Sequence, residues 1–241
     1  MNVAAPHRGT SGSIRGRDHA LSLRNNQDGL AVRSGEITVA VVTDGCSSGA
    51  SNEAGAKLGA EVLANAVAQL ASAGIDAQLA VRASDRLFAW LYESARALTT
   101  GEPELAKVVE RFFLFSFLCA VGKGDQTLIF GIGDGVWSVD GVLHVIDSGP
   151  ENAPAYLGYR ALPLGIPTEP VIHHLGPARS VLIATDGLAG ALAHDAELPR
   201  RWFSDALTFS NPAQLGRQLV VLAEQKKWLR DDTTVALLEA A

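Results

Sequence analysis

Apolar residues recur every second position, or in short unbroken runs, over many segments of the 241-residue chain. Both arrangements predict β-strands. The predicted strands cover residues 29–34, 36–43, 112–121, 127–132, 136–139, 142–146, 171–175, 180–185 and 233–238. In the middle third, short turns join successive strands, which favours antiparallel pairing.

A helical spacing of three to four residues interrupts the strands and predicts two long helices. The first carries apolar residues on one face, at Ala54, Leu58, Val62, Ala66 and Leu70. The second begins after Asp76 and runs to about Leu98, and further helices are predicted over residues 187–193 and from about 212 to 227. Because the strands are grouped and the helices are inserted as pairs, we expect an α+β fold with helices outside two packed sheets.

Three other segments have distinct expected structures. The polar, glycine-rich residues 1–13 predict a flexible tail, and they lack the apolar stretch of a secretory signal or membrane anchor. Residues 148–167, which are rich in proline and glycine, predict a long irregular loop beside a substrate cleft. Asp140 and Gly141 lie between two short predicted strands, so Asp140 is interpreted as a hairpin residue. With no linker visible, residues 14–241 are expected to form a single domain.

Composition and charge narrow the class of protein. A hydrophobic content of 47% allows a sizeable core. A net charge of −6, with no run of Lys and Arg, argues against a nucleic-acid partner. The longest apolar stretch, residues 112–121, is about half of the ~20 residues that span a bilayer, so no membrane association is expected. The two cysteines, Cys46 and Cys119, are far apart, which fits a reducing cytoplasmic location.

Four widely separated aspartates, Asp28, Asp44, Asp186 and Asp231, each lie where a strand-like run meets a turn. Residues 39–45 and 181–187 end in the same way, as an apolar run followed by Thr-Asp-Gly. A single Asp-Gly pair is most often only a turn. Together, however, the four carboxylates suggest a composite site for hard divalent cations such as Mg²⁺ or Mn²⁺, which prefer oxygen ligands. Gly45 could add a backbone carbonyl oxygen.

Other chemistries are disfavoured by specific residues. The Gly-rich segment 131–135 is followed by a predicted strand, whereas a dinucleotide-binding loop requires a helix there. A phosphatase with an aspartyl nucleophile would need a second Asp two residues before Asp44, and that residue is Val42. The chain also lacks a His-Glu-x-x-His zinc-protease motif and a Gly-Lys-Ser/Thr phosphate-binding loop.

Five short motifs, taken in their order along the chain, resemble the metal-dependent protein phosphatases of the 2C type, and especially their compact bacterial members. The motifs are Asn26 to Asp28, Val42 to Gly49, Gly133-Asp134, Thr185 to Gly187, and Asp231 to Val235. The resemblance spans about residues 16–239. It implies a four-layer α-β-β-α sandwich with two central, mainly antiparallel sheets, and a single phosphatase 2C-like catalytic domain.

The resemblance also implies a site and a reaction. Asp28, Asp44, Asp186, Asp231 and the Gly45 carbonyl would surround two Mn²⁺ or Mg²⁺ ions, and Asp134 would lie beside a weaker third ion. Asp232 occupies a companion position that is often Asn in this family. The implied reaction is the hydrolysis of phosphoserine or phosphothreonine in a phosphorylated protein substrate by metal-activated water, in opposition to a serine/threonine kinase. The alternative is a catalytically idle, phosphatase-like module that binds a phosphoprotein or a regulatory partner.

Four residues depart from the family pattern or have open roles. Gln27 replaces a Glu found in many members, and Cys46 stands where better-known eukaryotic members have a histidine thought to donate a proton. Arg24, four residues before Asp28, is a candidate for phosphate binding, with a solvated surface arginine as the alternative. His19 is a candidate for orienting a ligand or binding phosphate, with a structural role as the alternative.

Overall fold

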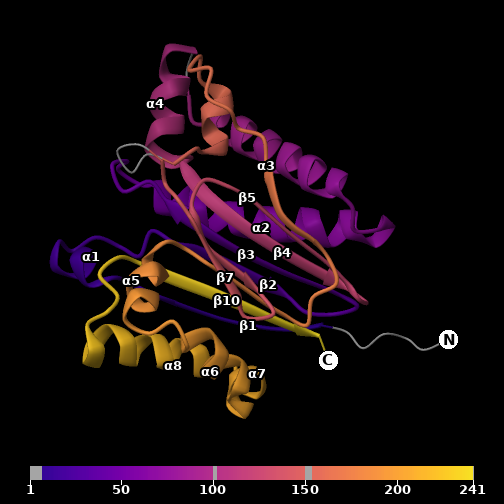
Figure 1. Ribbon diagram of the computed structural model, residues 1–241. Coiled ribbons are helices and arrows are strands. Elements are labelled where there is room, and N and C mark those ends of the chain that lie inside the picture. The colour runs from indigo at the N-terminus through magenta and orange to yellow at the C-terminus, as the bar shows by residue number, and fades with distance from the viewer. Residues whose placement is uncertain (1–6, 100–101, 150–153, 241) are drawn as a thin grey trace.

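Two five-stranded antiparallel sheets pack face to face in the computed structural model, which describes residues 7–99, 102–149 and 154–240. Helices cover both outer faces (Figure 1). This arrangement confirms the predicted α+β fold with four layers. In the described ranges, no helix is both long enough and apolar enough to cross a membrane.

Both sheets are built from antiparallel neighbours throughout. The first sheet has the strand order β1 (His7–Ile14), β10 (Thr233–Ala240), β9 (Ser180–Ala184), β6 (Gly135–Val139) and β7 (Val142–Ile146). The second has the order β2 (Gly29–Arg33), β3 (Ile37–Gly45), β4 (Phe115–Lys123), β5 (Gln126–Ile132) and β8 (Val171–Gly176). All the predicted strands are therefore present, with ends shifted by a few residues.

The helices divide between the two outer faces. Those packed on the second sheet are α2 (Asn52–Leu70), with the short η1 (Ala71–Ala73) after it, α3 (Ala77–Ala97), α4 (Glu102–Phe112) and η3 (Leu157–Ala161). Those that follow β9 are α5 (Gly187–His194), α6 (Leu198–Ser204), α7 (Ala206–Ser210), α8 (Gln214–Val220) and the π-helical η4 (Val221–Lys226). Near the N-terminus, α1 (Arg17–Leu21) links the two sheets.

Strand β3 shows why the central strands are apolar without alternation. Val39 and Val41 pack toward the helices on the second sheet, while Ala40 and Val42 pack toward the first sheet. All four side chains are buried. A strand that is covered on both faces loses the alternation of a half-exposed strand, so its sequence is a continuous apolar run that ends at Thr43 and Asp44.

The predicted flexible tail is wrong for residues 7–13, because they belong to β1. This strand pairs with β10 from His7 opposite Ala240 to Ile14 opposite Thr233. Its glycines permit close packing: a Cβ atom on Gly12 would lie 2.8 Å from the backbone nitrogen of Gly216 in α8. The polar, glycine-rich composition that suggested a flexible tail therefore belongs to an edge strand, which is held in place by β10 and α8. The prediction for residues 1–6 lies outside the described residues.

Several shorter elements were not predicted. Helices α1, α4, α6 and α7 were missed, as was the short η3 within the predicted irregular loop. Strand β4 begins at Phe115 rather than Phe112 because one apolar run continues across the end of α4 into the strand. The predicted hairpin at Asp140 is confirmed, since β6 and β7 pair around Asp140 and Gly141, which have φ angles of 49° and 84°.

Candidate metal centre

The five aspartates predicted for the site lie at strand ends, and these strand ends meet at one end of the sandwich. Asp28 precedes β2, Asp44 lies near the end of β3, Asp134 joins β5 to β6, Asp186 follows β9, and Asp231 precedes β10. Neighbouring antiparallel strands run in opposite directions, so the start of one strand and the end of the next lie at the same end of the sandwich. Residues up to 203 positions apart in the sequence, Asp28 and Asp231, therefore come together.

A small cavity of about 60 Å³, called the acidic cavity below, lies at this end of the sandwich. Its wall consists of His19, Gln27, Asp44, Gly45, Cys46, Ser47, Asp134, Pro154, Tyr156, Asp186 and Asp231. Six of the predicted site residues are therefore neighbours around one space. Asp28 lies next to them but is buried, whereas Arg24 does not line this cavity.

Asp28 has one carboxylate oxygen that lacks a partner. Its Oδ2 atom accepts a hydrogen bond of 2.8 Å from the Thr185 hydroxyl, which itself accepts one of 2.9 Å from the backbone N–H of Thr234. Among the described residues, buried Oδ1 accepts no hydrogen bond. Burial, together with the negative charges of Asp232 and Asp186, raises the pKa of the Asp28 carboxyl. A buried, unpartnered carboxylate is unfavourable unless a cation compensates it.

Asp44 and Asp186 show the same electrostatic conflict. Burial, and then repulsion from Asp28 and Asp186, raise the pKa of Asp44 well above its usual range. Burial, and then repulsion from Asp134 and Asp231, raise the pKa of Asp186 from 3.8 to about 6. Because several carboxylates share one small space, they cannot all ionise without cost. Their all-oxygen donor set and the unpartnered Asp28 oxygen fit Mg²⁺ or Mn²⁺.

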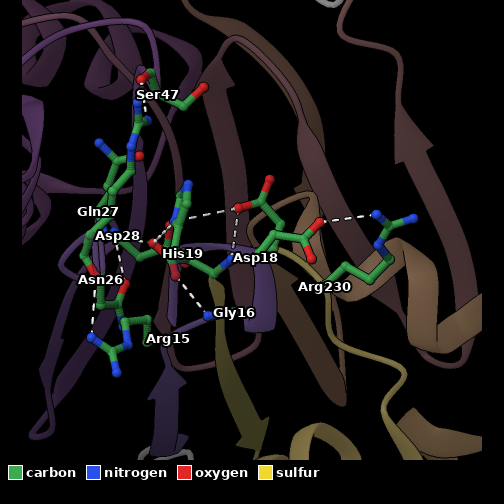
Figure 2. A network of polar contacts seen from close by, with 12 residues as sticks. Arg15, Gly16, Asp18, His19, Asn26, Gln27, Asp28, Ser47 and Arg230 are labelled. Carbon is green, nitrogen blue, oxygen red and sulfur yellow. Dashed lines mark hydrogen bonds and ion pairs between the residues drawn. The ribbon is translucent and has the colours of Figure 1, made fainter. Parts of the chain in front are cut away.

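Asp232 organises the wall of the acidic cavity. It is 2% exposed, and its carboxylate accepts hydrogen bonds from the backbone N–H groups of Gly16, at 2.7 Å, and Gln27, at 2.6 Å. It also contacts Nδ1 of His19 at 2.8 Å (Figure 2). The α1 segment, through Gly16 and His19, and the segment before β2, through Gln27, are thus both tied to the start of β10. His19 reaches the cavity because α1 is anchored in this way, and its Nδ1 lies 3.7 Å from Asp231.

Two glycines permit the close approach of chains around residues 231 and 232. A Cβ atom on Gly16 would lie 2.1 Å from the carbonyl carbon of Asp231, and one on Gly187 would lie 2.0 Å from the carbonyl oxygen of Asp232. Any side chain at these positions would displace the backbone that carries Asp231. The glycine that follows Asp186 therefore has a packing role as well as a turn role.

Asp134 and Tyr156 form the side of the cavity near the predicted loop. Asp134 is buried, and its Oδ2 accepts a hydrogen bond of 2.9 Å from the Ser148 hydroxyl. Tyr156 is 7% exposed, and its neighbours in the cavity include Cys46, Asp44 and Asp134. Burial is the main reason that the pKa of the Tyr156 hydroxyl is raised, so it remains a hydrogen-bond donor. No sequence motif pointed to Tyr156, although the loop was expected to flank a cleft.

A sequence comparison decides the family. The family model described as protein phosphatase 2C matches residues 15–229. The chain belongs to the protein phosphatase 2C family. As a member, it is a protein-serine/threonine phosphatase and a metal-dependent hydrolase. Comparison with curated protein sequences gives no match for this phosphatase.

Solved structures share the fold of this phosphatase at low sequence identity. A bacterial serine phosphatase has a TM-score of 0.67 and 16% identity, over 97% of each chain. The catalytic domain of the serine/threonine protein phosphatase PstP, in complex with two manganese ions, has a TM-score of 0.61 and 20% identity, over 97% of this chain and 98% of its own. A serine/threonine phosphatase from Staphylococcus aureus has a TM-score of 0.63 and 15% identity, over 100% of this chain and 98% of its own.

Proposed function

We propose that this phosphatase hydrolyses phosphoserine and phosphothreonine in proteins with water activated at a two-metal centre. Asp28, Asp44, Asp186, Asp231 and the carbonyl oxygen of Gly45 would hold two Mn²⁺ or Mg²⁺ ions, with Asp134 beside a weaker third ion. Two bound ions would lower the pKa of a water molecule and neutralise charge on the phosphoryl group. The observation that carries the proposal is the convergence of these carboxylates, from distant segments, on one cavity.

The other residues of the cavity would position the carboxylates and the substrate. Thr185 holds Asp28 through Oδ2 and leaves Oδ1 for a cation. Asp232 holds His19 through Nδ1, so Nε2 is the ring nitrogen left to contact a phosphoryl oxygen. We assign a second contact to the Tyr156 hydroxyl, which donates a hydrogen bond in its neutral form. Cys46 has no role in this scheme.

The substrate class follows from the same proposal. A serine/threonine phosphatase acts on phosphorylated proteins, so a phosphoprotein is the expected partner, and the activity would oppose a serine/threonine kinase. The small acidic cavity accommodates a phosphoryl group and its ions rather than a large organic ligand, since pockets for such ligands measure about 300–1,000 Å³.

The test is hydrolysis of p-nitrophenyl phosphate and of a phosphothreonine peptide in the presence of Mn²⁺. Asp44→Asn and Asp186→Asn should lower kcat/KM at least about a hundredfold, whereas Asp125→Asn, at an exposed turn, should leave the native rate. Chelation should abolish activity, and Mn²⁺ should restore it. Titration calorimetry should show Mn²⁺ binding that Asp44→Asn weakens. A native chain no faster than these two variants would favour the idle binding module instead.

A further inference from the structure

A second, polar pocket lies beside the acidic cavity and is not used by the proposed reaction. This pocket, called the Arg24 pocket below, has a volume of about 230 Å³. It is lined by Leu23, Arg24, Asn25, Gln27, Gly49, Ala50 and Glu53. Gln27 lines both spaces, and the turn that borders the acidic cavity at residues 45–47 continues into Gly49 and Ala50. The two spaces are therefore adjacent.

The turn after α1 places Arg24 between these two spaces. Leu23 has a φ of 57°, a left-handed conformation that is uncommon for a leucine. The backbone N–H of Arg24 donates a hydrogen bond of 2.9 Å to the carbonyl oxygen of His19. Its guanidinium Nη1 donates one of 2.6 Å to the carbonyl oxygen of Ser47, which borders the acidic cavity (Figure 2). One short segment thus carries His19 into one space and Arg24 into the other.

Arg24 carries a positive charge that no carboxylate in the described part of the chain neutralises within ion-pair distance. Arg15 is in the same situation, and its Nη1 donates a hydrogen bond of 3.2 Å to the carbonyl oxygen of Arg24 (Figure 2). Some other surface arginines have acidic partners, such as Arg8 with Glu239, Arg33 with Glu61, and Arg160 with Asp85, whereas Arg179 has none among the described residues. The Arg24 guanidinium therefore carries an uncompensated positive charge next to the acidic cavity, on a protein of net charge −6.

The acidic group of the Arg24 pocket is Glu53, which accepts a hydrogen bond of 3.4 Å from the Asn25 side chain. Its charge opposes an acidic ligand, but the guanidinium of Arg24 in the same pocket has no acidic partner within ion-pair distance in the described part of the chain. A guanidinium presents a planar fork of donors that matches a carboxylate. The volume of the pocket is below that of pockets for drug-sized ligands, about 300–1,000 Å³, and suits a side chain of a bound peptide.

We propose that the Arg24 pocket is a subsite for an acidic side chain close to the phosphorylated residue of the protein substrate, and that Arg24 determines this specificity. The inference rests on the phosphatase reaction proposed above. Arg24 then contacts the peptide beside the phosphoryl group, and not the phosphoryl group itself.

The experiment measures kcat/KM for phosphothreonine peptides that carry Glu, Gln or Lys at each position within three residues of the phosphothreonine. The native enzyme should prefer Glu over Lys about fivefold at one or more positions, the scale of an exposed ion pair, and the preference should weaken as salt is raised. Arg24→Gln should remove most of the preference, and Arg24→Lys should keep part of it. Arg179→Gln, which removes an exposed arginine beside Ser180 at the far end of β9, is the matched control and should retain it.

p-Nitrophenyl phosphate, which has no flanking residues, separates the possible outcomes. Arg24→Gln should lower kcat/KM more for the Glu peptide than for this small substrate. An equal loss on every substrate would place Arg24 at the phosphoryl group and overturn the subsite, as would a native preference for Lys or no preference at any position. A chain that hydrolyses neither substrate with Mn²⁺ would refute the proposed function and the subsite with it, whereas hydrolysis without preference refutes the subsite alone.

Discussion

Replacing Asp186 by asparagine should stabilise the metal-free protein at neutral pH, although it should abolish catalysis. Asp186 shares the acidic cavity with Asp134 and Asp231, and its pKa is raised from 3.8 to about 6, chiefly by burial and then by these charges. One pKa unit corresponds to about 1.4 kcal/mol. The ionised carboxylate therefore lowers the free energy of unfolding by about 3 kcal/mol. An uncharged amide of the same shape does not have this unfavourable effect.

The pH dependence of this effect has a defined sign. Between about pH 4 and pH 6, the folded protein holds a proton on Asp186 that the unfolded chain has released. The unfolding free energy of the metal-free native protein should therefore fall as pH rises through this window. Asp186→Asn lacks this titration, so its advantage over the native chain should grow from near zero at about pH 4 to about 3 kcal/mol above about pH 6.

Urea denaturation in the presence of a chelator, at several pH values, measures both unfolding free energies. Asp125→Asn removes the same charge from an exposed turn and should track the native protein. Adding Mn²⁺ at about a hundred times its Kd should stabilise the native chain by about 2.7 kcal/mol, and the variant by less. A variant that is less stable than the native chain in chelator at pH 7.5 would refute the electrostatic reasoning.

Three further substitutions test a predicted substrate contact, a close backbone packing and the left-handed end of a helix. Tyr156→Phe should raise KM for p-nitrophenyl phosphate about three- to tenfold through loss of one hydrogen bond to the substrate, with steady-state kinetics as the measurement. Gly187→Ala should cost about 1–3 kcal/mol by urea denaturation and weaken Mn²⁺ binding, because the added methyl group would meet the carbonyl oxygen of Asp232 at 2.0 Å. Lys227→Gly should stabilise the fold by about 1 kcal/mol in thermal denaturation, because exposed Lys227 ends η4 with a φ of 59°.

A different result in any of the three measurements would contradict the corresponding structural explanation. An unchanged KM in Tyr156→Phe would mean that this hydroxyl does not contact the substrate. Native stability in Gly187→Ala would show that the backbone at Asp232 yields without cost. A lower melting temperature for Lys227→Gly would mean that backbone entropy in the unfolded state outweighs the strain that glycine relieves.

The strands that carry the aspartates were predictable because burial on both faces leaves a strong local trace. Residues 39–42 are all apolar, since alternate side chains face the helices and the opposite sheet. The run must end where the chain leaves the sandwich, and Asp44 occupies that point. The same reasoning applies to Asp186 at the end of β9. Spacing and order along the chain were therefore sufficient to suggest a shared acidic site.

Strand β1 was not predictable in the same way, because its stability comes from pairing rather than from its own residues. Residues 7–14 contain glycine, serine and threonine in place of a strong apolar pattern. They form a strand because β10 supplies eight register partners, and because glycine lets α8 approach closely. Local composition does not record either contact.

Local order along the chain was enough to indicate the class of fold, the strand ends and the acidic residues, because burial and turn formation act between near neighbours. Only the folded structure decided how those residues are used: that Asp232 ties His19 to Gly16 and Gln27, that Tyr156 completes the cavity wall, and that Arg24 faces a neighbouring pocket. These contacts join residues up to 216 positions apart. They depend on how the two sheets meet in space, and no spacing along the sequence encodes that.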